Sequence, residues 1–191
     1  VWDSEGVRYA EPKLKMMGIE AVKSSTPAPC RQKIKDCLNV IMNEDEEAAQ
    51  KFIADFREHF DTLPIEDISF PRGCNNLNKW SNPATVYTKG TPIHVRGSLL
   101  YNFYIKKNKL AHKYPLIQDG EKIKFVYLKT PNKINENVIS FFQTFPKELG
   151  IDKQVDYDLQ FQKSFLEPIR VIMDTIGWKT EKVASLEFLF G

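Results

Sequence analysis

The sequence predicts a chain of the α+β class that is mainly helical. Apolar side chains recur at helical spacing in four stretches, at about 27–42, 45–60, 92–104 and 156–176. Residues 121–128 instead alternate apolar and cationic side chains, as a half-exposed strand does. Two further short strands are expected within residues 1–18, around the turn formed by Asp3-Ser4-Glu5-Gly6.

Composition excludes several other classes of protein. With 42% hydrophobic and 12% aromatic residues in 191, the chain can bury a core and is not disordered. It has no apolar run of about 20 residues and no basic, apolar leader, so neither a membrane span nor a secretion signal is predicted. Its three cysteines include no Cys-x-x-Cys pair and are expected to be reduced thiols of a cytosolic protein. The chain starts at Val1 within a strand-like segment, and we expect it to be a piece of a longer protein.

The helix at about 27–42 has a clear predicted start and one apolar stripe. Thr26 and Pro27 are typical of an N-cap followed by a first-turn proline. Three bases lie near this start, where the helix dipole does not favour cations. They are either close to an anion or part of a solvated surface. The stripe is Ile34, Cys37, Leu38 and Ile41, and the bases are Arg31, Lys33 and Lys35.

The helix at about 45–60 is preceded by four acids, Glu44 to Glu47. Acids are stabilised at a helix N-terminus, and consecutive residues cannot converge on one metal ion. We therefore expect helix-start chemistry here and no metal site. The two helices should form an antiparallel hairpin.

The 51-residue segment Ile68–Gln118, which we call the basic window, contains no Asp or Glu. An even distribution of the chain's 25 acids would place about 7 there. The window carries +8 and the remainder −6. A field of one sign over so many residues is typical of a protein that faces a polyanion. The alternative is that acids distant in sequence lie beside these cations in the fold. The cations are Arg72, Lys79, Lys89, Arg96, Lys106, Lys107, Lys109 and Lys113.

Within the window, turn-forming residues predict an irregular surface segment at 69–91. Trp80 and Tyr87 lie there beside lysines, a combination that suits contact with phosphate and sugar. Thr91 and Pro92 then predict an N-cap and a first-turn proline, which puts His94 and Arg96 in the first turns of a helix, where a phosphate can bind. For His94, a structural role is as consistent with the sequence as a functional one. The apolar side of this helix is expected to contain Leu99, Leu100, Phe103 and Tyr104.

The rest of the chain adds a second strand or a buried turn at 138–145 and a long helix at 156–176, bent at Pro168 and ended by Gly177. Trp178 is expected to pack back on the helices. No phosphate loop, nucleophile elbow or His-Glu-x-x-His occurs, and no Asp-x-Asp pair of the kind that holds two Mg²⁺ is recognised. The chain is therefore predicted to be a binding domain.

Three stretches resemble the replicative family B DNA polymerases of T-even-type bacteriophages, and together they cover about half of the chain. One is similar to the segment where their palm passes into the thumb: Val1-Trp2-Asp3, Glu5-Gly6, Arg8-Tyr9-Ala10-Glu11-Pro12-Lys13-Leu14-Lys15, Met17-Gly18, Glu20 and Lys23-Ser24-Ser25-Thr26-Pro27. Another is similar to the part of the thumb along the primer–template duplex: Asn75-Asn76, Lys79, Lys89 and His94-Val95-Arg96-Gly97 through Tyr101-Asn102. Ala184-Ser185-Leu186 with its Phe-rich end resembles the tail that engages the sliding clamp.

The resemblance implies a family B thumb with a short N-terminal β-hairpin from the palm. Residues 1–22 would be the palm end and connection, 23–180 the thumb, and 181–191 the clamp-binding tail. It implies DNA contacts at Lys23, Asn75, Asn76, Lys79, Trp80, Lys89, His94 and Arg96, with Trp80 standing in place of the family's usual tyrosine. It implies clamp contacts at Leu186, Phe188, Leu189 and Phe190.

By the same resemblance, the parent protein would be a DNA-directed DNA polymerase that uses Mg²⁺, has a 3′–5′ exonuclease and acts in the host cytoplasm. The family's polymerase Asp-x-Asp motif lies upstream of the segment that this chain resembles, so no catalytic residue, metal or cofactor is expected in this chain. The expected partners are double-stranded primer–template DNA and a sliding clamp, with no membrane. The alternatives are a stand-alone nucleic-acid-binding module and a clamp adaptor without polymerase activity.

Overall fold

The computed structural model describes residues 16–18 and 20–182, and it divides the chain into two compact units. The helical unit consists of Val1–Thr62 and Phe161–Gly191, and the sheet unit is Leu63–Gln160. The range 23–180, predicted as one thumb domain, therefore contains residues of both units. Each unit is described below by itself.

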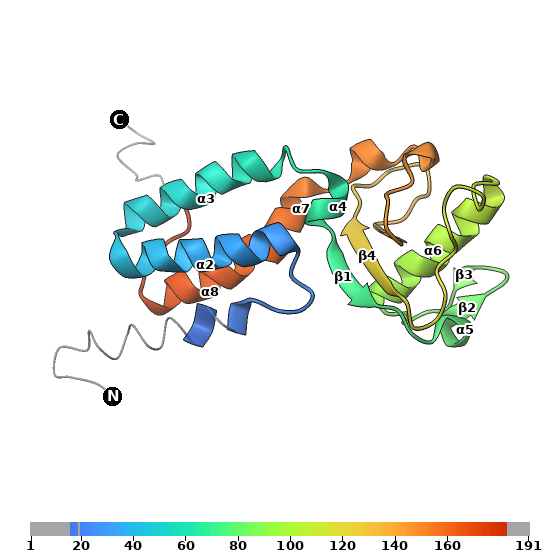
Figure 1. Ribbon diagram of the computed structural model, residues 1–191, viewed down its shortest axis with the longest axis horizontal. Helices are drawn as coiled ribbons and strands as arrows, with labels where there is room; N and C mark the ends of the chain where they lie inside the picture. Colours follow the sequence, from blue (N-terminus) through green and yellow to red (C-terminus); the bar gives the residue numbers. More distant parts are fainter. Residues whose placement is uncertain (1–15, 19, 183–191) are drawn as a thin grey trace. The chain divides into compact units, whose positions relative to one another are not determined.

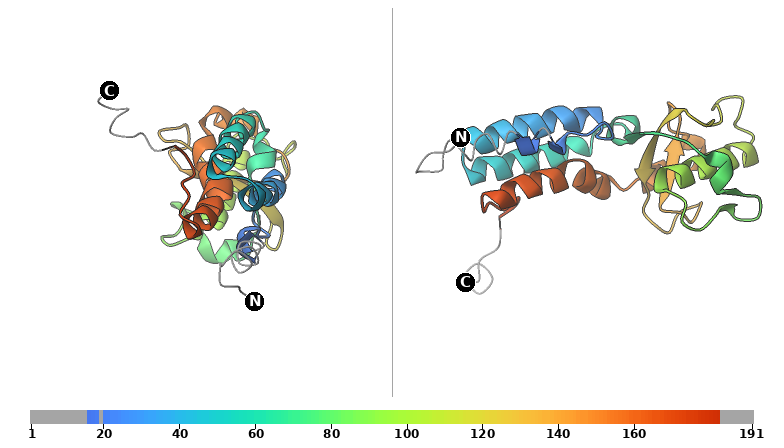
Figure 2. Two further views of the ribbon diagram at one scale, coloured as in Figure 1. Left: turned by 90° about the vertical axis from the view of Figure 1, so that its left-hand side faces the viewer. Right: turned by 90° about the horizontal axis from the view of Figure 1, so that it is seen from below.

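Three long helices of the helical unit lie side by side, as the views in Figures 1 and 2 show. They are α2 (Ala28–Asn43), α3 (Glu46–Phe60) and α8 (Glu167–Thr175). The first two form the predicted hairpin. Helix α2 buries the apolar stripe expected from its sequence, with Ile34, Cys37 and Ile41 at most 4% exposed, and α3 buries Ala49, Ile53, Phe56 and Phe60. Periodicity alone therefore located these helices to within two residues.

Phenylalanines form the centre of this unit. Phe56 lies 4.8 Å from Phe165 and 5.7 Å from Phe161, and Phe60 lies 5.4 Å from Phe161, measured between ring centroids. Such tilted and edge-on pairs add about 0.5–1.5 kcal/mol each to the stabilisation from burial alone. The Lys33 ammonium lies 5.6 Å from the ring centroids of Phe52 and Phe56.

Of the three bases near the start of α2, two have contacts within the fold. Lys33 covers the aromatic rings, and Arg31 donates hydrogen bonds to the carbonyls of Thr26 (2.9 Å) and Ser24 (2.8 Å). Lys35 is exposed. The solvated-surface alternative thus applies to Lys35 alone, and local carbonyl acceptors account for Arg31.

The two predicted helix starts have different outcomes. Asp45 caps α3, because its carboxylate accepts the backbone N–H of Ala48 at 2.9 Å, and the acid-rich start is confirmed. The prediction that Thr26 caps α2 is wrong. Pro27 occupies the N-cap position, and the Thr26 hydroxyl instead accepts the Lys23 N–H at 3.0 Å within the preceding turn.

The last helical segment is irregular, as Pro168 predicts. Helix α7 (Tyr157–Phe161) passes into a π-helical turn (Gln162–Leu166) and then into α8. The Glu167 N–H donates to the Gln162 carbonyl, five residues back, because the following proline has no N–H to continue the regular ladder and its ring crowds the preceding turn. Gly177 ends the helix with a φ of +76°, and Trp178 is half-buried behind it.

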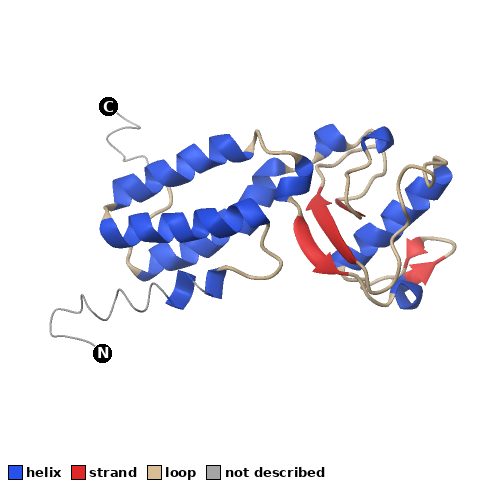
Figure 3. Ribbon diagram, in the orientation of Figure 1, coloured by secondary structure: helices blue, strands red, loops and turns tan. Residues whose placement is uncertain are grey.

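The sheet unit is built on three antiparallel strands in the order β1-β4-β5, drawn in red in Figure 3. They are β1 (Phe70–Gly73), β4 (Lys122–Tyr127) and β5 (Val138–Phe141). In their register Phe70 pairs with Phe125, and Phe125 pairs with Ser140. The strand predicted at 121–128 is confirmed, and 138–141 is a fully buried strand.

Helix α6 (Ile93–Lys107) packs against β5. Short elements complete the unit: α4 (Ile65–Ile68), α5 (Leu77–Trp80), β2 (Ser81–Asn82), β3 (Val86–Tyr87), and the 3-10 turns Lys147–Leu149 and Asp152–Gln154. The fully buried Gln160 links two of the elements. Its side-chain carbonyl accepts the Tyr127 N–H, and its amide donates to the Ile68 carbonyl, both at 2.8 Å.

Several expectations for the sheet unit need correction. Residues 69–91 are not irregular throughout, since they contain β1, α5 and the β2–β3 hairpin. Helix α6 starts one residue later than predicted, with Pro92 at the N-cap, and the Thr91 hydroxyl donates to the Thr88 carbonyl at 2.6 Å. Phe103 was expected on the apolar side of α6, but its side chain is 41% exposed. Tyr101, which was not expected there, is instead in the core at 1% exposed.

At the N-terminus, the predicted hairpin lies mostly in residues 1–15, outside the described residues. The part that is described, Met16–Gly18, is helical, so a strand there is wrong. Residues 184–191 also lie outside the described part. Within it, no helix is long and apolar enough to span a membrane. Cys30, Cys37 and Cys74 are free and buried, as expected of reduced thiols.

Candidate nucleic-acid interface

The β2–β3 hairpin brings two of the predicted phosphate contacts together. Ser81 pairs with Tyr87 and Asn82 with Val86, and the Thr88 N–H extends the ladder by donating to the Trp80 carbonyl at 2.9 Å. Lys79 and Lys89 follow directly at the open end of this ladder, and both are exposed. These two lysines are ten positions apart in the sequence, and from the open end of the hairpin both can contact one phosphate backbone.

Trp80 lies beside the first of these lysines. The Lys79 ammonium is 5.0 Å from the centroid of the Trp80 ring, a cation–π contact on a half-buried indole. The pair therefore presents a flat ring and a positive charge from one turn of α5.

The loop that contains Asn75 and Asn76 is held by an acid outside the basic window. The Asp119 carboxylate accepts the backbone N–H of Asn76 (3.3 Å) and that of Leu77 (2.8 Å). Asn76 has a φ of +64°, a left-handed conformation that asparagine tolerates better than most residues. Both asparagine side chains are exposed. They are thus available to a ligand, while Asp119 supports the loop.

Arg96 has internal partners that the sequence did not predict. Its guanidinium donates to the Asn137 side-chain oxygen at 2.6 Å and lies 5.7 Å from the centroid of the Tyr87 ring. The Tyr87 hydroxyl in turn donates to the Glu136 carboxylate at 2.7 Å. The prediction that Tyr87 faces phosphate alongside Lys89 is therefore not supported, because its polar end is already bonded. Arg96 connects α6 to the hairpin and to the loop before β5.

His94 is half-buried near the start of α6. Burial, and secondarily the charge of Arg72, lower the pKa of its imidazole from the ordinary value of 6.5. Its ring centroid lies 6.5 Å from that of Phe125, and its carbonyl accepts the hydroxyls of Ser98 (2.8 Å) and Ser140 (2.9 Å). At neutral pH His94 is therefore an uncharged ring that can donate a hydrogen bond to a phosphate oxygen but adds no positive charge.

Most cations of the basic window have no acid beside them in the fold. Lys113 forms an ion pair with Glu148 at 3.1 Å. Six others are exposed and have no ion pair within the described residues: Arg72, Lys79, Lys89, Lys106, Lys107 and Lys109. The sheet unit as a whole contains 14 Lys and Arg against 9 Asp and Glu, a net charge of +5. Among the described residues, Lys113 is thus the one cation of the window that forms an ion pair with an acid distant in sequence.

The remaining predicted contacts lie elsewhere. Lys23 is exposed and belongs to the helical unit. Leu186, Phe188, Leu189 and Phe190 lie outside the described residues. Among residues 16–18 and 20–182, no cluster of three or more His, Cys, Asp or Glu could hold a metal ion.

Sequence reasoning missed the groups that position this surface. Asp119 could have been noticed as the acid of an Asp-Gly turn directly after the window. Arg72 was counted among the cations but left out of the contact set, although it is exposed and acts electrostatically on His94. Glu136 and Asn137 carry no sequence signature, because they meet Tyr87 and Arg96 only through the tertiary fold.

Comparison with known proteins identifies a class of relatives, the DNA-directed DNA polymerases of bacteriophages. This chain is 31% identical to the DNA-directed DNA polymerase of Enterobacteria phage T4 and 34% identical to that of Escherichia phage RB69. Each alignment covers 100% of this chain and 21% of the relative. The predicted resemblance to T-even-type phage polymerases is therefore confirmed over the whole chain, which spans about a fifth of the length of these relatives. No family model matches the chain.

Proposed function

We propose that this chain is the thumb of a family B DNA-directed DNA polymerase and holds the primer–template duplex through its phosphates. The observation that carries the proposal is the set of six exposed cations without ion pairs in the described part of the basic window. The end-to-end similarity to two phage DNA polymerases supports DNA as the polyanion. Phosphate contacts carry no base information, so binding should be independent of sequence.

Each contact has a distinct part in this proposal. Lys79 and Lys89 supply point charges at the open end of the hairpin, and Trp80 offers a flat ring beside them. Asn75 and Asn76 offer amides from the loop that Asp119 holds. Neutral His94 donates a hydrogen bond to a phosphate oxygen. Lys23 is proposed as a further phosphate contact from the helical unit.

The chemistry of polymerisation is assigned to the parent protein and not to this chain. The described residues do not fit a magnesium site, since their acids do not gather into one cluster. The purified chain should therefore not extend a primer. Nucleotide incorporation above that of a mock-purified control would contradict this assignment.

The tail is proposed to bind a sliding clamp. Leu186, Phe188, Leu189 and Phe190 place four large apolar side chains in the last six residues. Burial of each would contribute about 1.5–3 kcal/mol before the cost of ordering, so the isolated peptide should bind in the micromolar range. Deletion of residues 185–191 should abolish clamp binding and leave DNA affinity unchanged. Retained clamp binding would contradict the assignment.

The test of duplex binding is the dependence of affinity on salt. About five phosphate contacts predict a log–log slope near −4 to −5 between roughly 50 and 200 mM salt. Lys79→Ala and Lys89→Ala should each reduce the slope by about one, without a change in melting temperature. The matched control is Lys153→Ala, an exposed lysine of the same unit outside the basic window. Affinity that is insensitive to salt, or that depends strongly on base sequence, would refute the proposal.

A further inference from the structure

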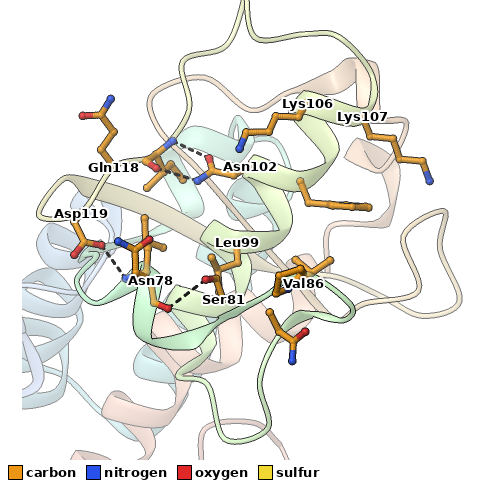
Figure 4. A pocket seen from close by; sticks show the side chains of 14 residues that line it. Asn78, Ser81, Val86, Leu99, Asn102, Lys106, Lys107, Gln118 and Asp119 are labelled. Atoms are coloured by element: carbon orange, nitrogen blue, oxygen red, sulfur yellow. Dashed lines mark hydrogen bonds between the residues drawn. The ribbon is translucent and has the colours of Figure 1, made fainter.

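Helix α6 and the β2–β3 hairpin form a surface pocket of about 770 Å³ within the sheet unit, which we call the α6 pocket (Figure 4). This volume lies in the range of about 300–1,000 Å³ that is usual for sites of small ligands. Much of the lining is apolar and comes from four separate segments of the chain. These apolar residues include Leu77, Val86, Leu99, Phe103 and Ile117.

One free positive charge faces the pocket. In Figure 4 the Lys106 side chain extends toward Asn102 and Gln118, whereas Lys107 extends away from them. Lys106 is exposed and has no ion pair in the part of the chain that the structure describes. The acid of the pocket, Asp119, already accepts two backbone N–H groups at 3.3 and 2.8 Å. The pocket therefore favours an anionic ligand.

An aromatic ring is exposed in the same pocket. Phe103 is 41% accessible, and its ring meets Tyr104 edge-on with centroids 5.0 Å apart. The Lys107 ammonium lies 5.8 Å from the Phe103 centroid. An exposed phenylalanine on the same helix as Lys106 provides an apolar surface on which a flat ring can stack while a phosphate next to it meets a cation.

Two side-chain amides complete the polar lining. Asn78 and Gln118 are exposed, and no hydrogen bond from either side chain occurs within the described residues. Asn102, in contrast, is bonded on both sides to the Ile117 backbone, at 2.9 and 2.8 Å. A free amide offers both a donor and an acceptor, so it can meet the edge of any base without preference.

We propose that the α6 pocket holds one unpaired nucleotide of a DNA strand. Its base lies against Phe103, its phosphate meets Lys106, and the amides of Asn78 and Gln118 contact the base edge. The inference rests on the proposed DNA binding and adds a single-strand subsite to it. Lys106 is also one of the six exposed cations of the duplex proposal, whereas Phe103, Asn78 and Gln118 are not assigned to the duplex, so Phe103→Ala tests the pocket separately.

The test measures binding of the 191-residue chain to labelled oligo(dT), to a blunt duplex of the same length, and to free dTMP. Phe103→Ala should weaken oligo(dT) binding about tenfold, because it removes one base–aromatic stack, and should leave duplex binding unchanged. Phe103→Trp should retain the affinity. Lys106→Gln should weaken oligo(dT) binding more than the matched control Lys129→Gln, an exposed lysine that does not line the pocket.

Backbone amide NMR shifts locate the ligand. Oligo(dT) should shift the signals of residues 99–106 and 117–119, and dTMP should shift them only at much higher concentration. Oligo(dT) binding that is unaffected by both pocket variants would overturn the inference. Equal affinity for dTMP and for the oligonucleotide would overturn the assignment to a strand. If the unmodified chain does not bind the duplex but both pocket variants still weaken oligo(dT) binding, the proposed duplex binding is refuted and the pocket inference stands.

Discussion

Gly97 in helix α6 and Ser140 in strand β5 approach so closely that no side chain fits between them. A Cβ atom at Gly97 would lie 2.8 Å from the backbone nitrogen of Ser140 and 3.1 Å from the carbonyl carbon of Ile139, and it would also overlap the Ser140 hydroxyl. The contact holds the helix that carries His94 and Arg96 against the sheet. A glycine in the middle of a helix is thus explained by packing, despite its unfavourable helix propensity.

Gly97→Ala should therefore destabilise the sheet unit. Alanine would gain up to about 1 kcal/mol in helix propensity, but overpacking against a strand backbone typically costs about 1–3 kcal/mol, and the backbone cannot move aside as a side-chain end can. We expect a net loss of about 1 kcal/mol in urea denaturation. Gly73→Ala is the control, because nothing lies within 4 Å of a Cβ atom there, and it should change stability little. An unchanged or raised stability of Gly97→Ala would show that α6 can shift on the sheet.

The buried thiols should be unreactive in the folded chain. Burial raises the pKa of Cys30 to about 11 and that of Cys37 to about 12, and it also raises the pKa of Cys74. At pH 8 roughly one Cys30 in a thousand would be a thiolate, the form that reacts. Labelling with a thiol reagent at pH 8 should be slow in native conditions and fast for all three cysteines in urea. Immediate reaction of one thiol in the native chain would show an opening at that site.

Sequence periodicity predicted most of the fold because the long elements obey it. Helices α2 and α3 each bury one regular face, so their apolar residues recur at the expected intervals. Strand β4 buries Ile123 and Phe125 as the alternation predicts, but it buries Val126 as well. Phe103 was wrongly placed in the core because it lies near the apolar stripe of α6 but faces a pocket. Thr26 and Thr91 were wrongly taken as N-caps because each hydroxyl has a nearer partner in the preceding turn.

The sequence predicted the charged residues of the candidate site, but not the residues that hold them in position. An acid-free window can be counted in the sequence, and the cations in it are indeed mostly exposed. Asn137 and Glu136 are about 40 to 50 residues from Arg96 and Tyr87, and they meet these partners only because β5 follows a loop that returns to α6. Pairings of this kind depend on tertiary folding, and one-dimensional patterns do not encode them.

Arg96 should be coupled to Asn137. Removal of either side chain leaves the other without its hydrogen bond at 2.6 Å and loosens the hairpin that Tyr87 anchors. Arg96→Ala and Asn137→Ala should each lower the melting temperature, and the double variant should cost less than the sum, with a coupling of about 0.5–3 kcal/mol. Additive effects would mean that the contact contributes nothing. If Arg96 also contacts phosphate, Arg96→Ala will reduce the salt slope of DNA binding by about one, whereas Asn137→Ala will not.

His94 should make stability dependent on pH in a defined direction. Because burial, followed by the charge of Arg72, lowers its pKa below 6.5, the folded chain binds fewer protons than the unfolded chain at mildly acidic pH. The stabilisation that comes from keeping His94 neutral is complete above pH 6.5 and is lost as the pH falls from there through the lowered native pKa. Urea denaturation between about pH 5 and 8 should show this loss, and His94→Gln should reduce it. Arg72→Gln should raise the His94 pKa only in part, since burial is the larger cause.

NMR titration of the imidazole checks the premise directly, and a His94 pKa at or above 6.5 in the folded chain would contradict it. Acidification through this range should also tighten duplex binding, because the protonated ring adds a charge to the surface that carries Lys79 and Lys89.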